Sequence, residues 1–179
     1  ERIMEIKKKE PLKAEQMAQD LATFAFDRTD TKELLTSIPE NSNLNLTTIE
    51  YELQILKILS AGWGISFFIP ETDKNKEKLT NVFWEHIREM SNSISNLTQT
   101  TTGQSIDYFD ILKKRLNTYL VNMQENVEGT QNPASIIGPA FADACITNSE
   151  NNAIAILIGT KMFTLTLAAV KEYLNSGND

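Results

Sequence analysis

The chain has very few of the side chains that carry catalysis or hold metal ions. It contains one cysteine and one histidine in 179 residues. A single cysteine excludes an internal disulfide. A single histidine cannot supply the paired Glu-x-x-His motifs of a di-iron bundle, or the usual ligands of a zinc site. No glycine-rich phosphate-binding loop occurs either. We therefore expect no catalytic residue, no metal and no cofactor.

Glycine and proline are also scarce, with seven and five residues. Few helix breakers favour long helices, and no segment alternates polar and apolar residues as a strand would. The sequence predicts an all-α fold, a single-domain helical bundle over residues 1–179. We expect about five major helices and one or two short ones. Residues 1–10 are expected to be an extended or frayed segment.

Apolar residues recur at helical spacing in successive segments that turn signals separate. The long helices are predicted at Pro11–Asp27, Thr47–Ile69, Leu79–Leu97, Ile106–Val127 and Asn152–Asn175. Thr47 and Glu50 predict a capping box for the second of these. Short helices are predicted after Asp30 and after Asn132-Pro133, the latter broken or kinked at Gly138-Pro139. The threonine-rich segment Thr98–Gly103 is predicted as a loop.

The charge balance argues against nucleic acid as a partner. The net charge is −7 and the pI about 4.8, whereas nucleic-acid binding needs a basic surface. Two basic clusters exist, Lys7–Lys9 and Lys113–Arg115. We expect both to be solvated patches, with contact to an anion or a partner as the alternative.

The segment Ala153–Val170 is apolar on nearly every side and is long enough to cross a bilayer. Three features argue against a membrane span: Lys161 lies at its middle, its flanks lack basic clusters, and they lack paired aromatic residues. Four amphipathic helices need an apolar partner, so we expect this segment to be the buried helix at the centre of the bundle. A membrane span and an oligomeric interface are the alternatives. A buried Lys161 would require a carboxylate or carbonyl partner.

Two glycines in the second long helix, Gly62 and Gly64, flank Trp63. A glycine inside a helix costs about 1 kcal/mol relative to alanine, so a reason is expected. We predict that another helix packs closely against the bared backbone, with Gly159 as its counterpart. The alternative is a bend that makes room for a small apolar ligand beside Trp63.

Three further aromatic residues complete the candidate ligand or interface set. Phe67 and Phe68 follow Trp63, and Trp84 follows Phe83 in the next helix. Phe68 and Trp84 fall off the main apolar stripes. If exposed, they would be interface anchors, because large aromatic side chains contribute much binding energy.

The residues with catalytic potential have simpler explanations. We expect Cys145 to be a small buried apolar residue, and His86 to be a partly buried residue with local hydrogen bonds. A dyad of the two would require them to meet in space. The closest acidic pairs are expected to be solvated surface; these are Glu50 with Glu52, Asp107 with Asp110, and Glu125 with Glu128.

These observations predict a non-enzymatic helical protein-interaction module that associates with itself as a homodimer or binds a protein partner. A helical bundle that binds a small apolar ligand near Trp63 is the alternative, followed by an enzyme and a membrane-associated fragment. We expect a cytoplasmic protein. Because the chain begins with Glu1, we expect a fragment or a processed product, and an upstream signal or membrane segment stays open.

Overall fold

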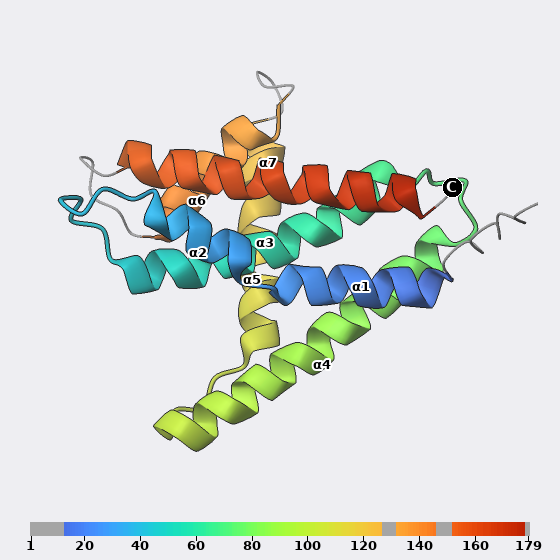
Figure 1. The fold of residues 1–179 in the computed structure, drawn as a ribbon, viewed down its shortest axis with the longest axis horizontal. Coiled ribbons are helices and arrows are strands. Elements are labelled where there is room, and N and C mark those ends of the chain that lie inside the picture. The colour runs from blue at the N-terminus through green and yellow to red at the C-terminus, as the bar shows by residue number, and fades with distance from the viewer. Residues whose placement is uncertain (1–12, 127–131, 146–151, 178–179) are drawn as a thin grey trace, which may run out of the picture.

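A computed structural model describes residues 13–126, 132–145 and 152–177, and within these ranges it contains seven helices and no strand. The all-α, single-domain bundle predicted from the sequence is confirmed. Expectations were also stated for residues 1–10, which include Lys7–Lys9, and for Glu128, and these residues lie outside the described ranges. The helices are α1 (Ala14–Phe26), α2 (Thr29–Thr36), α3 (Leu46–Phe68), α4 (Lys76–Thr102), α5 (Tyr108–Glu125), α6 (Ala134–Ala144) and α7 (Asn152–Ser176) (Figure 1).

Helix α3 is the most enclosed element of the bundle. It contacts all six other helices, and every residue from Ile55 to Ile65 is buried. Its apolar residues surround the helix axis rather than forming one stripe, which is typical of a helix covered on all sides. The expectation of a central helix buried all round therefore fits α3 better than α7.

Helix α7 lies along α3 and α6 and leaves its outer face to solvent. It is the one helix in the described part of the chain that is long and apolar enough to span a membrane. The mean hydropathy of its most apolar 18-residue window is 1.9, and 39% of that window is buried. Lys161 is exposed, so the carboxylate or carbonyl partner that a buried lysine would require is not needed. Its ammonium group is solvated because it projects from the uncovered side of the helix.

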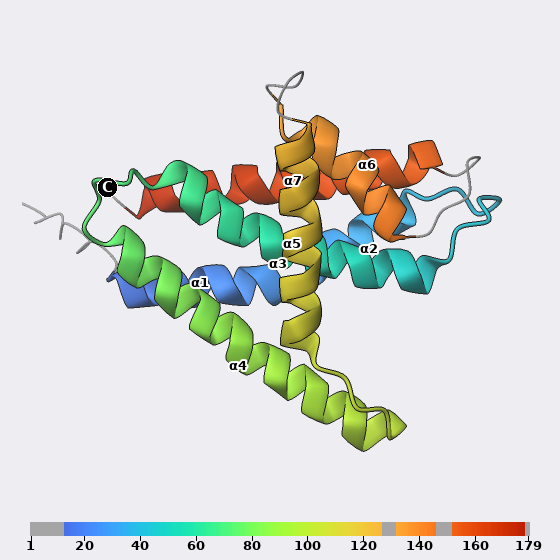
Figure 2. The same ribbon diagram turned by 180° about the vertical axis from the view of Figure 1, so that it is seen from behind.

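The remaining helices cover α3 from the other directions. Helix α1 packs on α4 and α3, and α6 packs on α7 and α5. Seen from behind, α5 crosses the body at a steep angle, and the distal half of α4 extends away from the body until a short connection leads back into α5 (Figure 2). Helices α4 and α5 lie at a wide angle to each other, and both contact α3.

Three local predictions differ from the structure. The N-cap of α3 is Asn45, whose Oδ1 accepts a hydrogen bond from the Thr48 backbone N–H at 3.1 Å, so the Thr47–Glu50 capping box is not used. Residues 98–102 are helical rather than a loop, and their threonine hydroxyls donate to carbonyls one turn earlier, as Thr98 does to Ile94 at 2.9 Å. Of the break or kink predicted at Gly138-Pro139, the break does not occur, because α6 continues through Pro139.

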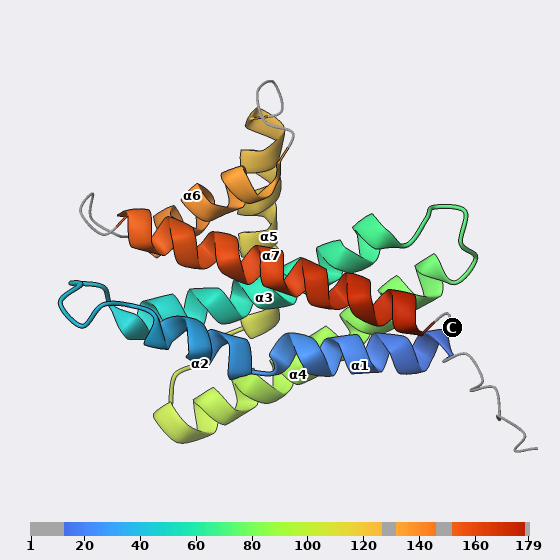
Figure 3. The same cartoon turned by 45° about the horizontal axis from the view of Figure 1, so that its top comes forward.

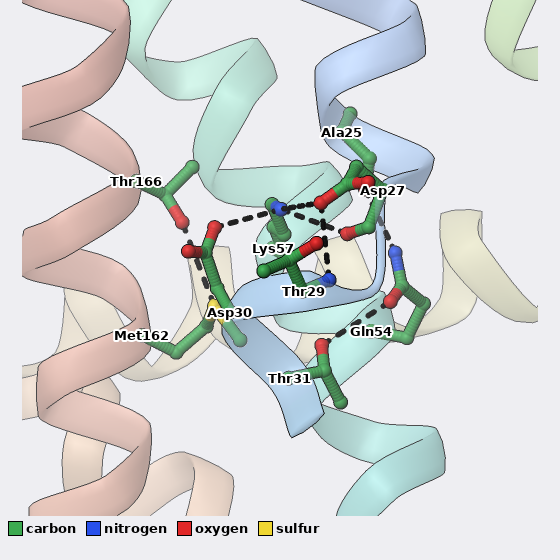
Figure 4. Close-up of polar contacts among 9 residues, drawn as sticks. All are labelled: Ala25, Asp27, Thr29, Asp30, Thr31, Gln54, Lys57, Met162 and Thr166. Atoms are coloured by element: carbon green, nitrogen blue, oxygen red, sulfur yellow. Dashed lines mark hydrogen bonds and ion pairs between the residues drawn. The ribbon is translucent and has the colours of Figure 1, made fainter. Parts of the chain in front are cut away.

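A fully buried lysine fixes the corner between α1 and α2 against α3 (Figure 4). Lys57 Nζ lies 2.8 Å from Asp30 Oδ2 and donates a hydrogen bond to the Asp27 carbonyl at 2.8 Å. It also lies 4.4 Å from the centroid of the Phe24 ring. Beside it, Gln54 Nε2 donates to the Ala25 carbonyl at 2.8 Å. These contacts satisfy the ammonium group and the carbonyls that the end of α1 leaves without helical partners.

Candidate functional site

An apolar groove runs between α4 and α5, and we call it the Trp84–Phe109 groove. One part of it is a cavity of about 140 Å³ lined by Leu59, Trp84, Phe109, Leu112, Lys113 and Leu116. A neighbouring hollow of about 310 Å³ shares Trp84 and Phe109 and is bounded by Asn81, Glu85 and Arg88. Apolar side chains thus form the floor, and charged side chains form the rim.

The position of Trp84 depends on the absence of a side chain at Gly62. A Cβ atom at Gly62 would lie 2.4 Å from Trp84 Cζ2, which is closer than two carbon atoms can approach. The indole ring therefore rests directly on the backbone of α3. On its own helix it meets Phe83 edge to face, with ring centroids 5.1 Å apart. These two contacts hold one wall of the groove in place.

The other wall is the first half of α5, which is anchored at its beginning. Asp107 is the N-cap, and its Oδ1 accepts a hydrogen bond from the Asp110 backbone N–H at 2.9 Å. The Tyr108 backbone N–H donates to Ser95 Oγ of α4 at 3.0 Å. Asp110 also pairs with Lys114, four residues later on the same helix, at 2.7 Å. The start of α5 is therefore tied to the far end of α4.

Further along α5, an ion pair between Arg115 and the buried Glu52 joins this helix to α3. Arg115 Nε donates to Glu52 Oε2 at 2.8 Å, and the second arm of the guanidinium donates to Oε1 at 2.5 Å. The Glu52 side chain is only 4% exposed. Burial raises the pKa of the Glu52 carboxyl, while the hydrogen bond from Arg115 opposes this effect. The expectation that Glu52 and Arg115 are solvated surface is wrong, because both turn inward and neutralise each other.

Behind this pair lie two further buried polar groups. The Tyr119 hydroxyl has no hydrogen-bond partner among the described residues, and burial raises its pKa. Burial also raises the pKa of the Cys145 thiol to about 12. A thiol with that pKa is not a nucleophile at neutral pH, and the prediction that Cys145 is a small buried residue is confirmed.

The structure does not assemble a dyad of His86 and Cys145. His86 belongs to α4 and pairs with Glu89 on the same helix, with Nδ1 3.5 Å from Oε2. Cys145 is the C-cap of α6, a helix that packs on α7, α5 and α3. In the described ranges, no three His, Cys, Asp or Glu side chains are grouped so that they could hold a metal ion.

The predicted candidate residues do not form one site. Trp63 is 8% exposed, and its ring meets Tyr119 and Phe163 edge to face at centroid distances of 5.9 Å and 6.0 Å. These rings fill the space beside Trp63 where a ligand was considered. Phe67, by contrast, is 51% exposed. Phe68 is partly buried, with Lys171 Nζ 5.7 Å from its ring centroid.

The glycines do permit close packing, but their partners are not the predicted ones. A Cβ atom at Gly64 would lie 2.8 Å from Val170 Cγ1 of α7, so α3 and α7 approach closely there. Gly159 instead faces Phe141 of α6, whose Cδ1 would be 2.5 Å from an added Cβ. Gly159 is therefore not the counterpart of Gly62 and Gly64. It serves the α6–α7 contact.

A second cavity lies at the end of the bundle and has a volume of about 480 Å³. Its walls come from the beginning of α1, from the α3–α4 connection and from the end of α7, and they include Phe68, Ile69 and Leu174. Lys78 of α4 pairs with Glu15 of α1 at its rim, at 2.5 Å. The cavity combines an apolar wall with charged edges.

Sequence reasoning placed Trp84 among the candidates but missed its partners on α5. Phe109 and Leu116 lie at helical spacing on α5, and both are only partly buried. Glu52 was also missed, although a signal was present. It follows Ile49 by three residues and precedes Leu56 by four, so it lies on the buried side of its helix.

Comparison of the chain with protein-family models, with curated proteins and with solved structures finds no match in any of the three.

Proposed function

We propose that this chain is a non-enzymatic protein-interaction module that binds an amphipathic helix of a partner protein in the Trp84–Phe109 groove. The observation that carries the proposal is an apolar hollow between α4 and α5 that is lined by the partly exposed side chains of Trp84 and Phe109. Tryptophan is among the few side chains that carry most of the binding energy of an interface when a partner desolvates them fully.

The spacing of the apolar residues on α5 favours a helical guest. Phe109, Leu116 and Leu120 follow one another at intervals of seven and four residues, which places them on one side of α5. Leu120 is 38% exposed and extends the apolar track beyond the cavity. A guest helix that presents apolar residues one turn apart matches this track in the way helix-in-groove complexes do.

The rim carries charge of both signs. Arg88 and Glu85 lie 3.6 Å apart on the α4 side, and Lys113 lies over the Phe109 ring on the α5 side, 5.5 Å from its centroid. All of these charged groups are solvated or paired at the surface. They are placed to orient a partner rather than to transform a substrate.

Selection of helical peptides tests the proposal directly. A displayed library of 16-residue amphipathic helices is selected on the wild-type protein, and the affinity of the enriched peptides is measured by fluorescence anisotropy. We expect apolar residues at four-residue spacing in the enriched peptides and at least about a tenfold loss of affinity for Phe109→Glu. Phe67→Glu is the matched control, because Phe67 is an exposed phenylalanine outside the groove. Peptides that bind Phe109→Glu as well as the wild type would contradict the proposal.

A second candidate function is small-molecule binding in the end cavity beside Phe68. Its volume of about 480 Å³ lies within the range of ligand pockets. Native mass spectrometry of protein purified without detergent would reveal a retained ligand, and Leu174→Trp should abolish its binding by filling the cavity. Absence of any retained mass, and of any thermal shift with a panel of apolar ligands, would count against this alternative.

A further inference from the structure

The outer face of α7 carries a charge and size pattern that is complementary to itself. We define this face by the exposed residues Leu157, Lys161, Thr164, Leu165, Ala168 and Glu172. Leu157 and Leu165 are 54% and 52% exposed, which is high for leucine on a helix that packs against three others. In Figures 1 and 3, α7 runs along the outside of the molecule with no other helix in front of it.

We propose that two copies of this chain associate through the outer faces of α7, in antiparallel orientation about a two-fold axis between Thr166 and Leu167. In this register, residue 161 lies opposite residue 172 of the second copy, because each residue and its counterpart are equally far from the axis. Lys161 then meets Glu172 twice, once on each side of the axis. A two-fold contact of this kind uses the same surface on both copies.

The same register also matches the apolar residues at the centre. Leu165 lies opposite Ala168 of the second copy, and the two-fold axis repeats this pair. A large side chain thus meets a small one, as close helix packing requires. Near the edge of the contact, Leu157 lies opposite Ser176.

Other arrangements of two α7 helices are less favourable. A parallel pair in register places Lys161 beside Lys161 and Glu172 beside Glu172. An antiparallel pair centred on Lys161 also brings the two lysines together. Like charges at an interface oppose association. Lys171, the other charged residue on this side, lies at the edge of the face and over Phe68 of its own chain.

This inference explains Lys161 without placing it in a core or a membrane. Exposed leucines on both sides of a lysine form a poor surface for a monomer and a poor centre for a membrane span. They form a good surface for a partner that supplies a carboxylate at that position. Because the contact uses one helix face, it belongs to the small interfaces, and we expect micromolar affinity.

Charge reversal tests the register. Sedimentation equilibrium over 1–200 µM should show a dimer for the wild type. We expect Lys161→Glu and Glu172→Lys each to raise the dissociation constant at least tenfold, and the double reversal to restore it to within threefold of the wild type. Lys74→Glu, at an exposed lysine outside this face, is the control. Circular dichroism verifies that each variant is folded.

Cysteine crosslinking tests the orientation. In the antiparallel register, the two copies of residue 161 lie about 16 Å apart along the direction of the helices. Lys161→Cys alone and Glu172→Cys alone should therefore not form a disulfide-linked dimer, whereas the double variant should. A chain that stays monomeric up to 200 µM would overturn the proposal. A monomeric chain that binds phosphatidylcholine vesicles, as measured by co-flotation, would overturn it as well. A dimer that neither charge reversal weakens would overturn it too.

The dimer face on α7 and the groove between α4 and α5 share no residue. In the absence of peptide, Phe109→Glu should leave the dimer constant unchanged, and the charge reversals on α7 should leave peptide binding by the monomer unchanged. Failure of one proposal is thereby distinguished from failure of the other.

Discussion

Replacing Lys57 should cost less stability than replacing its partner Asp30. The Lys57 side chain is fully buried, whereas the Asp30 side chain is 34% exposed. Asp30→Asn leaves a buried ammonium group with one carbonyl bond and the more distant Asp27 carboxylate, 3.9 Å away. Removal of one partner from a buried ion pair costs about 3–5 kcal/mol when the remaining charge stays buried. Because the Asp27 contacts remain, we expect about 3 kcal/mol for Asp30→Asn.

In Lys57→Met, the opposing contributions to the free energy of unfolding nearly cancel. The substitution keeps the buried stem, removes the ammonium group, and leaves two carboxylates that water can reach. The lost charge-assisted hydrogen bonds, worth about 1.5–3 kcal/mol each, are offset by the desolvation penalty that is no longer incurred. We expect a net loss of about 1 kcal/mol. The free energy of unfolding of both variants is measured by urea denaturation, with Lys74→Met as the control at an exposed lysine.

A double-mutant cycle separates the ion pair from other effects of Asp30. Asp30 lies in the first turn of α2, where its charge also interacts favourably with the helix dipole. Asp30→Asn in the Lys57→Met background measures that contribution alone, which we expect to be under about 1 kcal/mol. The reasoning is refuted if Lys57→Met destabilises the protein as much as Asp30→Asn, or if the cycle shows no coupling.

Three further outcomes follow from the packing and the pKa values. Gly62→Ala should displace the Trp84 ring, lower the unfolding free energy by about 1–3 kcal/mol and shift tryptophan emission to longer wavelength; an unchanged spectrum would contradict the close contact. Because the pKa of Glu52 is raised in the folded state, its ionisation opposes folding; stability relative to Glu52→Gln should fall as the pH rises above 4.5, and a rise would contradict the assignment. With a pKa of about 12, the Cys145 thiol should react with iodoacetamide at pH 8 at least tenfold more slowly in native than in urea-unfolded protein, and equal rates would contradict its burial.

The sequence was sufficient for the helices because their apolar residues repeat at helical spacing and few breakers interrupt them. It was less informative about which helix lies at the centre. Both α3 and α7 are strongly apolar, and only tertiary contacts show that α3 is covered on all sides while α7 is not. Hydropathy measures the composition of a helix and cannot say whether its last free face meets solvent, lipid or another chain.

The candidate groove was only half predictable for a related reason. Trp84 could be selected because it falls off its own stripe. Its partner Phe109 lies on the stripe of α5, and it is partly exposed only because α4 and α5 lie at a wide angle to each other. The angle between two helices depends on the shapes of all the side chains between them, so no local pattern encodes it. Glu52 and Arg115 are 63 residues apart, and likewise only the tertiary fold reveals them as a pair.

Gly62 and Gly64 connect the Trp84–Phe109 groove to helix α7, because a residue next to each surface packs on the same turn of α3. Being two residues apart, they face nearly opposite sides of α3, so Trp84 rests on one side of a single helical turn and Val170 on the other. No flexible side chain separates either neighbour from the backbone, and packed interiors transmit small displacements. A partner that shifts Trp84 would press through this turn on α7. If that shift changes the affinity between copies, dimer formation must change the affinity for the partner by the same factor.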